Sequence, residues 1–514
     1  MNQSGAPSSS RPARGSGEFA QPPSRRYAAY VVALLAVGNL LSYLDRNIIF
    51  ALFGPIKKEL LVTDQQLGWL GSAYAIVFSL AALFSGVISD IVSRRAVLAG
   101  GLALWSGFTA LGATARSYLQ LFVTRSLVGV GQSAYLPAGQ ALLADYYPTK
   151  GRAQAMGIFW IGLALGGTLA VYIGGILGTF AGWRLTLIVV GLPGLIFALL
   201  MGRLRDPATE SRTSMTRHPA AQFRFTRRAA LRAAMPLVVS LLLATAVFGF
   251  LGLFGRIPPN AGIAAFGTVA GIGLIWSVYL WVRLVLRYKH LFPVANTADL
   301  LDEMMDGAST VLRTPTLIWL FVGGALTSAA MNSLVAWSTT YLQRELHMSL
   351  VEAGRSIGPI GLSAGIIGSW LGGKLGDEMM DKFPGGRVLA ASLGFVIGAP
   401  LCFWMLLVGS RTLFGILFFF VVFFYTWYNG PVAAALFDVV PRRISATVMG
   451  VYVFFIHIAG DAIALPVIGA LSDRFGIRPA LLALPMIGLL GGVVLLFALF
   501  TVKNDMARVR RSPA

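Results

Sequence analysis

Two versions of one pattern occur far apart in the chain, ALLADYYP at residues 141–148 and AALFDVVP at residues 434–441. In each string an acidic residue stands three positions before a proline. A second pair follows the same order, GVISD at residues 86–90 and GKLGD at residues 373–377. The two pairs are separated by 293 and 287 residues. Such matched repeats indicate that the chain consists of two related halves.

The composition indicates that these halves lie in a lipid bilayer. Of the 514 residues, 56% are hydrophobic and 12% are charged, whereas soluble domains have about 25% charged residues. The apolar runs are about 20 residues long, which is the length of a helix that crosses about 30 Å of hydrocarbon. We therefore predict an all-α integral membrane protein.

The apolar runs predict fourteen spans, arranged as two six-helix halves with two inserted helices between them. The predicted spans are residues 28–50, 67–89, 96–115, 118–145, 153–179 and 185–203 in the first half, 234–254 and 262–286 in the inserted pair, and 315–341, 352–375, 387–408, 412–438, 446–472 and 478–502 in the second half. The predicted domains are a disordered cytoplasmic tail (1–26), the N-terminal half (27–203), a basic cytoplasmic loop (204–233), the inserted pair (234–286), a cytoplasmic linker (287–314), the C-terminal half (315–502) and a cytoplasmic tail (503–514).

The charge pattern predicts the orientation. The net charge is +20, which in a soluble protein would suggest a nucleic-acid partner. Here the basic residues gather in the short loops between apolar runs, as the positive-inside rule describes. We therefore expect the lipid bilayer, and no nucleic acid, as a partner. The pattern predicts a multi-pass protein with both termini in the cytoplasm. The high content of Ala, Gly and Arg favours the inner (plasma) membrane, and an organelle membrane is the alternative.

Several kinds of chemistry are excluded by what the sequence lacks. It has no GxxxxGK[ST] phosphate loop, so no ATP-driven pump is expected, and it has no nucleophile–base set in a soluble domain, so no enzyme is expected. The single cysteine, Cys402, lies in an apolar run, which excludes an internal disulfide and a thiolate metal cluster. We expect neither a cofactor nor a metal.

Longer strings carry a resemblance to a known family. The string GVISDIVSRR at residues 86–95 resembles the signature of the major facilitator superfamily, with Ile91 and Ser93 where that family prefers Arg and Gly. Four further strings resemble its spinster-like branch, which transports lysolipids and sphingolipids: SYLDRNIIF (42–50), RSLVGVGQSAYLPAGQALLADYYP (125–148), GWR (182–184) and HIAGDAIALPVIGALSD (457–473). The resemblance implies the major facilitator fold. The anion:cation symporters of sugar acids share a Tyr-x-Asp-Arg in the first span and are the alternative branch.

The repeated Gly-x-x-x-Asp strings are candidate gating elements. Asp90 can cap or pair with a neighbouring helix end while Arg94 and Arg95 face the cytosol, which predicts a latch that breaks when the halves move. Ordinary loop charge would explain the two arginines but not the repeated acid. The predicted latch residues are Gly86, Asp90, Arg94, Arg95, Gly373 and Asp377.

Charged residues within the first span are candidates for proton coupling. An ionisable residue at bilayer depth costs at least about 2.5–3.5 kcal/mol, so each needs a partner or a function. Asp45 and Arg46 are adjacent, about 100° apart around a helix, and so face different neighbours. The spinster resemblance implies that Asp45 is the proton-sensing carboxylate and that Arg46 regulates it. The alternative is a static pair between Asp45 and Arg125.

Arg125 and Gln132 are seven residues apart and share one helix face. The guanidinium of Arg125 suits an anionic head group. Spinster proteins usually carry Glu where this chain has Gln132, which leaves either Asp45 alone as the proton carrier or an uncoupled facilitator. Both residues are predicted to contact substrate.

The second half offers corresponding candidates. His457 and Asp461 are four residues apart on one helix face and could form a second proton relay, or could be packed polar groups. Counted from the repeat, Asn332 falls opposite Asp45 and is predicted to line the central cavity. An apolar wall for an acyl chain is predicted from aromatic residues, chiefly Tyr135, Trp337 and Tyr425.

These features predict a secondary transporter that works by alternating access on an amphiphilic anion such as a lysophospholipid or sphingolipid, with protons as a candidate coupling ion. An organic-anion or sugar-acid symporter is the alternative. A receptor or scaffold that does not transport is the alternative of another class, and the buried charges argue against it.

Overall fold

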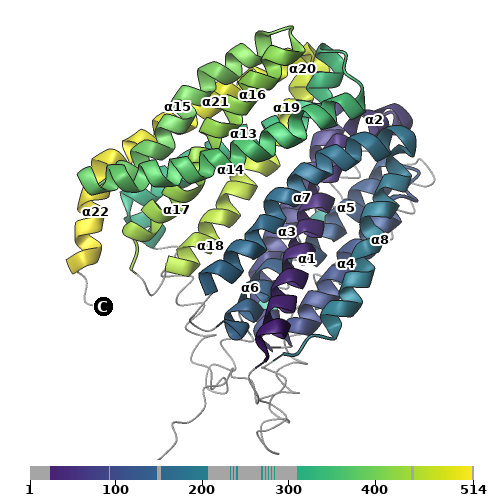
Figure 1. Cartoon of the computed structure of the whole chain (residues 1–514), viewed down its shortest axis with the longest axis horizontal. Coiled ribbons are helices and arrows are strands. Elements are labelled where there is room, and N and C mark those ends of the chain that lie inside the picture. The colour runs from purple at the N-terminus through teal and green to yellow at the C-terminus, as the bar shows by residue number, and fades with distance from the viewer. Residues whose placement is uncertain are drawn as a thin grey trace, which may run out of the picture.

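In the computed structural model the described residues form helices joined by short connections; these residues are 23–91, 93–147, 152–206, 310–441 and 445–511 together with isolated positions between 232 and 283. Apart from residues 204–206 and those isolated positions, the predicted basic loop and inserted pair lie outside the described residues, as do most of the predicted linker (287–314) and of the predicted N-terminal tail (1–26). The helices form two bundles, one from each half of the chain (Figure 1). The all-α membrane fold predicted from the sequence is confirmed.

The six predicted spans of the first half are each helical. They are α1 (Arg25–Ala51), α3 (Asp64–Ile91), α4 (Arg94–Gly112), α5 (Tyr118–Ser133) with α6 (Tyr135–Tyr146), α7 (Arg152–Phe180) and α8 (Gly182–Gly202). A short helix, α2 (Phe53–Leu60), occupies the connection between the first two spans and had no apolar run to predict it.

The second half repeats this order. Its spans are α13 (Pro315–Glu345), α14 (Leu350–Lys382), α15 (Gly386–Leu407), α16 (Arg411–Tyr425) with η1 (Thr426–Tyr428) and α17 (Asn429–Asp438), α18 (Ser445–Phe455) with η3 (Ile456–Asp461) and α19 (Ala462–Phe475), and α20 (Ile477–Leu481) with α21 (Ala483–Phe497). The chain continues as α22 (Leu499–Arg511).

The fourth span of each half is interrupted at the same place. Proline is the third residue of the helix after the interruption in both halves, Pro137 in α6 and Pro431 in α17. Proline lacks the backbone N–H and its ring clashes with the carbonyl four residues earlier, so a continuous helix is disfavoured there. The shared break supports the duplication that the repeated strings predicted.

The segment predicted as the C-terminal tail is helical, because α22 continues the last span as a helix to Arg511. Asp505 of α22 is buried and accepts hydrogen bonds from the backbone N–H and the hydroxyl of Thr316, at 3.1 and 2.7 Å. These bonds satisfy a donor at the start of α13 and hold α22 against the bundle.

The two halves meet where glycines allow backbones to touch. A Cβ on Gly68 of α3 would lie 2.4 Å from the carbonyl oxygen of Leu465 in α19, and one on Gly469 would lie 2.3 Å from the carbonyl oxygen of Asp64. Gly354 of α14 meets the α7 backbone in the same way. These approaches lie at one end of the molecule, which we call the closed end.

At the opposite end, the open end, the two bundles diverge (Figure 1). Helices α6, α18 and α22 lie there, whereas α2, α19 and α20 lie at the closed end. The halves therefore form a V whose vertex is the closed end.

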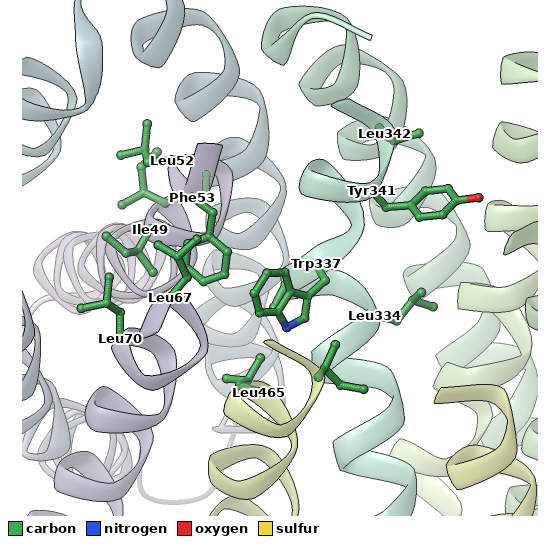
Figure 2. Close-up of a cluster of buried hydrophobic side chains, with 14 of the residues drawn as sticks. Ile49, Leu52, Phe53, Leu67, Leu70, Leu334, Trp337, Tyr341, Leu342 and Leu465 are labelled. Carbon is green, nitrogen blue, oxygen red and sulfur yellow. The ribbon is translucent and has the colours of Figure 1, made fainter. Parts of the chain in front are cut away.

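An apolar cluster made by both halves fills the closed end (Figure 2). Phe53 at the start of α2 contacts Trp337 of α13 with ring centroids 5.1 Å apart. Leu67, Leu70 and Leu465 lie beside this aromatic pair and are buried. Burial of such side chains contributes about 1.5–3 kcal/mol each, so the cluster favours contact between the halves.

We predict that Gly68→Ala will weaken the closed end. The added methyl group would overlap the α19 backbone, although alanine otherwise stabilises a helix by about 0.5–1 kcal/mol over glycine. Spin-label distances between α2 and α20 should lengthen in this variant. Gly107→Ala is the matched control, because a Cβ there meets nothing within 4 Å, and equal distances in both variants would contradict the prediction.

Candidate functional site

Asp45 of α1 is enclosed within the first half, with 2% of the residue exposed. The Thr109 hydroxyl of α4 lies 2.9 and 2.8 Å from its two carboxylate oxygens. From α5, Gln132 Nε2 donates to Oδ2 at 3.0 Å and Arg125 Nη1 donates to Oδ1 at 3.3 Å. The pair between Asp45 and Arg125 that the sequence raised as an alternative is therefore present in this conformation.

Most hydrogen-bonding atoms of the Arg125 and Gln132 side chains already have partners. Arg125 also donates from Nη2 to the backbone oxygen of Asp45 at 3.1 Å, and its Nε is buried with no hydrogen-bond partner among the described residues. The Gln132 side-chain oxygen accepts from the Tyr74 hydroxyl at 2.7 Å. An anionic ligand can reach Arg125 only if its pairing with Asp45 loosens.

Arg46 points to a different environment from Asp45, as their 100° separation predicts. Its guanidinium lies over the rings of Tyr43 and Tyr74, 5.7 and 5.3 Å from their centroids. It also interacts electrostatically with Asp461 of the second half. Arg46 is thus a charged group of the first half that interacts with an acid of the other half.

Asp461 is the centre of a corresponding cluster in the second half. Its carboxylate accepts from Ser328 at 2.7 Å and from Asn332 at 3.0 Å, and it lies 2.7 Å from His457 Nδ1. Asn332 belongs to α13, the first helix of its half, as Asp45 belongs to α1. The structure therefore joins three predicted residues, Asn332, His457 and Asp461, in one site.

This cluster lies on an irregular helical turn. Residues Ile456–Asp461 form a π-helix, η3, between α18 and α19. Single π-turns within α-helices occur frequently at functional sites because they alter the helical register locally. Asp461, the last residue of this turn, is directed toward α13, where it accepts from Ser328 and Asn332.

The predicted aromatic residues are packed in the interior. Tyr135 donates from its hydroxyl to the Leu35 carbonyl at 2.8 Å, and Tyr425 stacks on Phe395 with centroids 4.3 Å apart. Trp337 belongs to the apolar cluster of the closed end. All three predicted residues are buried in this conformation.

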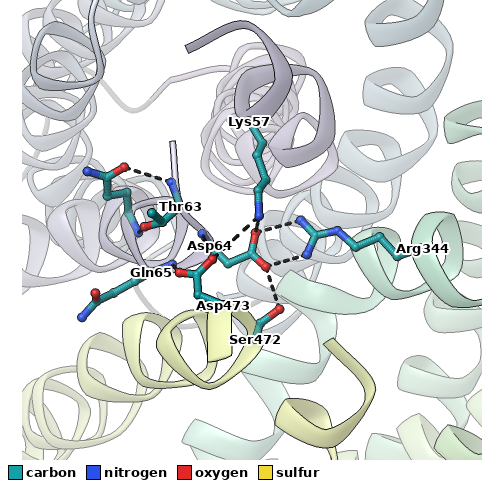
Figure 3. Close-up of polar contacts among 8 residues, drawn as sticks. Lys57, Thr63, Asp64, Gln65, Arg344, Ser472 and Asp473 are labelled. Atoms are coloured by element: carbon teal, nitrogen blue, oxygen red, sulfur yellow. Dashed lines mark hydrogen bonds and ion pairs between the residues drawn. The ribbon is translucent and has the colours of Figure 1, made fainter. Parts of the chain in front are cut away.

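A polar network that the sequence did not predict lies at the closed end (Figure 3). Asp64, the first residue of α3, receives both terminal nitrogens of Arg344 from α13, at 2.5 and 2.7 Å. Ser472 of α19 donates to the same carboxylate at 2.6 Å, and Lys57 of α2 donates at 2.5 Å. One carboxylate of the first half is thus bonded by two helices of the second half.

The second half also caps α3. The Asp473 carboxylate accepts from the backbone N–H groups of Asp64 and Gln65, at 2.8 and 2.9 Å (Figure 3). These donors lie in the first turn of α3, where they have no partner within the helix. Asp473 therefore satisfies a helix end of the opposite half, as an N-cap residue would.

The charge state of Asp64 follows from these bonds. Burial would raise the pKa of this carboxyl, but the hydrogen bonds from Arg344, Lys57 and Ser472 outweigh burial and lower its pKa to about 2. Asp64 precedes the predicted span and is ionised throughout the physiological range.

Three predicted latch residues, Arg94, Arg95 and Asp377, lie at the open end and bond within their own half. Arg94 forms an ion pair with Asp145 of α6. Arg387, at the equivalent place in the second half, pairs with Asp438 at 2.7 Å and with Asp377 at 2.8 Å. These pairs connect the two repeated strings inside one half, so they stiffen each half.

The other latch residues are placed as follows. Arg95 donates to the Leu204 carbonyl at 3.2 Å. A Cβ on Gly373 would meet nothing within 4 Å, so no close approach requires that glycine. Gly86 and Asp90 belong to α3, and the side chain of Asp90 lies outside the described part of the structure.

Two bundles that are joined at one end, each with a buried acid cluster, define a polytopic membrane transporter. The family model of the Major Facilitator Superfamily matches residues 35–261 and 259–460. The chain therefore belongs to the major facilitator superfamily.

Curated relatives narrow this placement. The chain is 24% identical over 452 residues to an MFS-type efflux pump of Mycolicibacterium smegmatis, which covers 88% of this chain and 85% of the relative. It is 22% identical over 520 residues to protein spinster homolog 3 of Danio rerio, covering 94% and 87%. A galacturonate transporter of Dickeya chrysanthemi is 30% identical over 172 residues, which are 33% of this chain and 49% of that protein.

A solved structure has the same fold. It is a bacterial homologue of the human lysosomal transporter spinster in an inward-facing, unoccupied conformation, with a TM-score of 0.71 and 19% identity, covering 96% of this chain and 100% of that one. The spinster-like resemblance that the sequence predicted is confirmed.

We predict that Asp64→Asn will open the closed end in a larger fraction of molecules. The amide keeps the shape of the side chain but lacks the negative charge that binds Arg344 and Lys57. The loss of one charge-assisted hydrogen bond should shift the equilibrium between the closed and open forms of this end by about tenfold. Spin-label distances across the closed end measure this shift. Glu352→Gln is the control, because this exposed carboxylate at the same end pairs with Arg411 of its own half; an equal shift in both variants would refute the assignment.

The contribution of Asp64 to the closed end should be insensitive to pH near neutrality. A carboxyl whose pKa is lowered by its partners contributes its full stabilisation above its ordinary pKa of about 4. This stabilisation is lost as the pH falls through the lowered pKa, which for Asp64 is about 2. Any change of the same spin-label distances between about pH 5 and 8 should therefore be independent of Asp64 and persist in Asp64→Asn. A transition in this window that Asp64→Asn abolishes would contradict the prediction.

Proposed function

We propose that this chain moves an anionic amphiphile across a membrane by alternating access. The observation that supports this most is the uneven distribution of contacts between the halves. Asp64 is bonded by the second half at the closed end, while the bundles diverge at the open end (Figure 1). A carrier that exposes its centre to one side at a time needs one closed end and one open end.

The open end is proposed to face the cytoplasm. Arg94, Arg95 and Arg387 lie at this end, and basic residues are retained on the cytoplasmic side of membrane proteins. Helix α1 begins and α22 ends there (Figure 1), which agrees with cytoplasmic termini. The conformation is then inward-facing, and a cell's inner membrane is the proposed location.

The two acid clusters are proposed to couple protons to movement. Gln132 is neutral, so within the Asp45 cluster only Asp45 can exchange a proton at moderate pH. In the other half, Asp461 is paired with His457, and its charge attracts Arg46 across the interface. Protonation of Asp461 would weaken that attraction and let the halves separate.

The substrate is proposed to be a lysophospholipid or sphingolipid with an anionic head group. The relationship to protein spinster homolog 3 extends over 94% of this chain, whereas the galacturonate transporter aligns over 33%. Arg125 is proposed to bind the head group after its pair with Asp45 loosens, together with Gln132 and Asn332. Trp337, which contacts the other half, would contact the acyl chain after the halves move, whereas Tyr135 and Tyr425 are packed inside single halves. The higher local identity of the galacturonate transporter makes a sugar acid the second candidate.

We predict that a pH gradient drives labelled lysophospholipid into proteoliposomes containing this protein and that Asp45→Asn and Asp461→Asn abolish the effect of the gradient. Neither variant should lose exchange of labelled for unlabelled substrate, since exchange needs no net proton movement. This second assay shows that each variant is folded. Glu378→Gln, at an exposed acid outside both clusters, should behave as wild type.

Other outcomes have definite meanings. Uptake of a labelled hexuronate without lysophospholipid uptake would refute the lipid assignment. Lysophospholipid uptake by the wild-type protein that is independent of the pH gradient would refute proton coupling. The absence of any substrate flux or exchange would refute transport.

A further inference from the structure

The Asp45 carboxylate lies inside the first half, where side chains of α4 and α5 bind it. Its hydrogen-bond partners are Thr109 of α4 and Arg125 and Gln132 of α5. Among the described residues, none of the second half forms a hydrogen bond or ion pair with this carboxylate. A change in its protonation has to reach the interface between the halves through neighbouring side chains or through its long-range field.

Gln132 is the neighbour that connects Asp45 to a further helix. The residue is 1% exposed, and both ends of its amide are bonded. Its Nε2 donates to Asp45 Oδ2 at 3.0 Å, and its Oε1 accepts from the Tyr74 hydroxyl of α3 at 2.7 Å. Since an amide has its donors on the nitrogen and its acceptor on the oxygen, the orientation of Gln132 depends on whether Asp45 accepts or donates.

Protonation of Asp45 can reverse this chain of hydrogen bonds. An ionised carboxylate only accepts, whereas a protonated carboxyl also has an O–H donor. When that O–H donates to Gln132, the amide has to turn so that Oε1 faces Asp45 and Nε2 donates to the oxygen of Tyr74. The proton stays on Asp45, and the tyrosine hydroxyl changes from a donor to an acceptor.

Tyr74 lies where such a change can reach the second half. Its ring is 5.3 Å from the guanidinium carbon of Arg46, which is within cation–π range. Helix α3 packs directly against η3 and α19 of the second half, and a Cβ on Gly71, one turn before Tyr74, would lie 2.9 Å from Leu465 Cδ1. Arg46 also interacts electrostatically with Asp461 of η3. Tyr74 therefore connects the Asp45 cluster to the contact between the halves.

We propose that Gln132 and Tyr74 form a relay that transmits the protonation state of Asp45 to Arg46 at the interface between the halves. While Asp45 is ionised, the Tyr74 hydroxyl donates, which leaves the ring more electron-rich and favours the cation over it. When Asp45 is protonated, the hydroxyl accepts, the ring attracts Arg46 less, and the guanidinium is freer to interact with Asp461. Tyr74 is thus a positioning residue that acts through Arg46.

This inference rests on the proposed function, because it supplies the route by which Asp45 influences the movement of the halves. The relay is surrounded by further titratable or charged groups of α1, α5 and the second half, namely Tyr43, Arg125, His457 and Asp461. Asp461 and its partner His457 are a second place where a proton can bind. A test of the relay therefore has to separate their effect from that of Asp45.

Tyr74→Phe tests the relay, because it removes the hydroxyl and keeps the ring over Arg46. Tyr118→Phe is the matched control, since this buried hydroxyl also joins α5 to α3 but donates to a backbone carbonyl, that of Gln66, at 2.8 Å. Infrared difference spectra of the full-length protein at varied pH record protonation of Asp45 as the carboxyl band that Asp45→Asn removes. Spin-label distances across the open end record the movement of the halves.

In the wild-type protein, part of the pH-dependent change of these distances should be lost in Asp45→Asn. Tyr74→Phe should lose the same part completely, although its Asp45 carboxyl band still appears, which also shows that this variant is folded around Asp45. The double variant should lose no more than either single variant, as expected for residues on one route. Tyr118→Phe should retain the whole change.

The other outcomes separate the relay from proton coupling itself. If Tyr74→Phe retains the part of the distance change that depends on Asp45, or if Tyr118→Phe loses an equal part, the relay is overturned while coupling through Asp45 stands. If Asp45→Asn leaves the pH-dependent distances unchanged, proton coupling through Asp45 is refuted, and the relay is refuted with it.

Discussion

The arrangement of the whole molecule depends on one buried carboxylate, that of Asp64. With 1% of the residue exposed, its charge would be costly without partners. Three of the hydrogen bonds that satisfy it come from the second half, two from Arg344 and one from Ser472. The halves must therefore meet at this point, and Gly68 and Gly469 let their backbones approach closely enough. The aromatic contact and the surrounding leucines then exclude water from the same end.

Away from the closed end, the hydrogen bonds of the two acid clusters and the ion pairs lie within single halves, which is why the halves can move as rigid bodies. Asp45 is bonded to Thr109, Arg125 and Gln132 of its own bundle. Asp461 is bonded to Ser328, Asn332 and His457 of the other. The ion pairs at the open end likewise stay inside one bundle. Motion can then occur by breaking the contacts of the closed end without disrupting either core.

The sequence predicted the helices and the two-half design well, because apolar runs of membrane length and matched repeats are local signals. It also placed His457 beside Asp461, since residues four apart share a helix face. The Asp64 network could not be predicted, because its partners Arg344 and Ser472 lie 280 and 408 residues away. No local pattern encodes such a pairing. The π-turn that joins Asp461 to Asn332 was missed for a related reason, since its register depends on packing against α13.

The central claim is that the two ends of the interface open in turn. Single-molecule fluorescence with one dye pair across the closed end and another across the open end, recorded in membranes with substrate present, tests it most directly. The account predicts two anticorrelated populations, in which separation at one end accompanies contact at the other. A population in which both ends separate together, or a closed end that never opens while substrate is being transported, would contradict it.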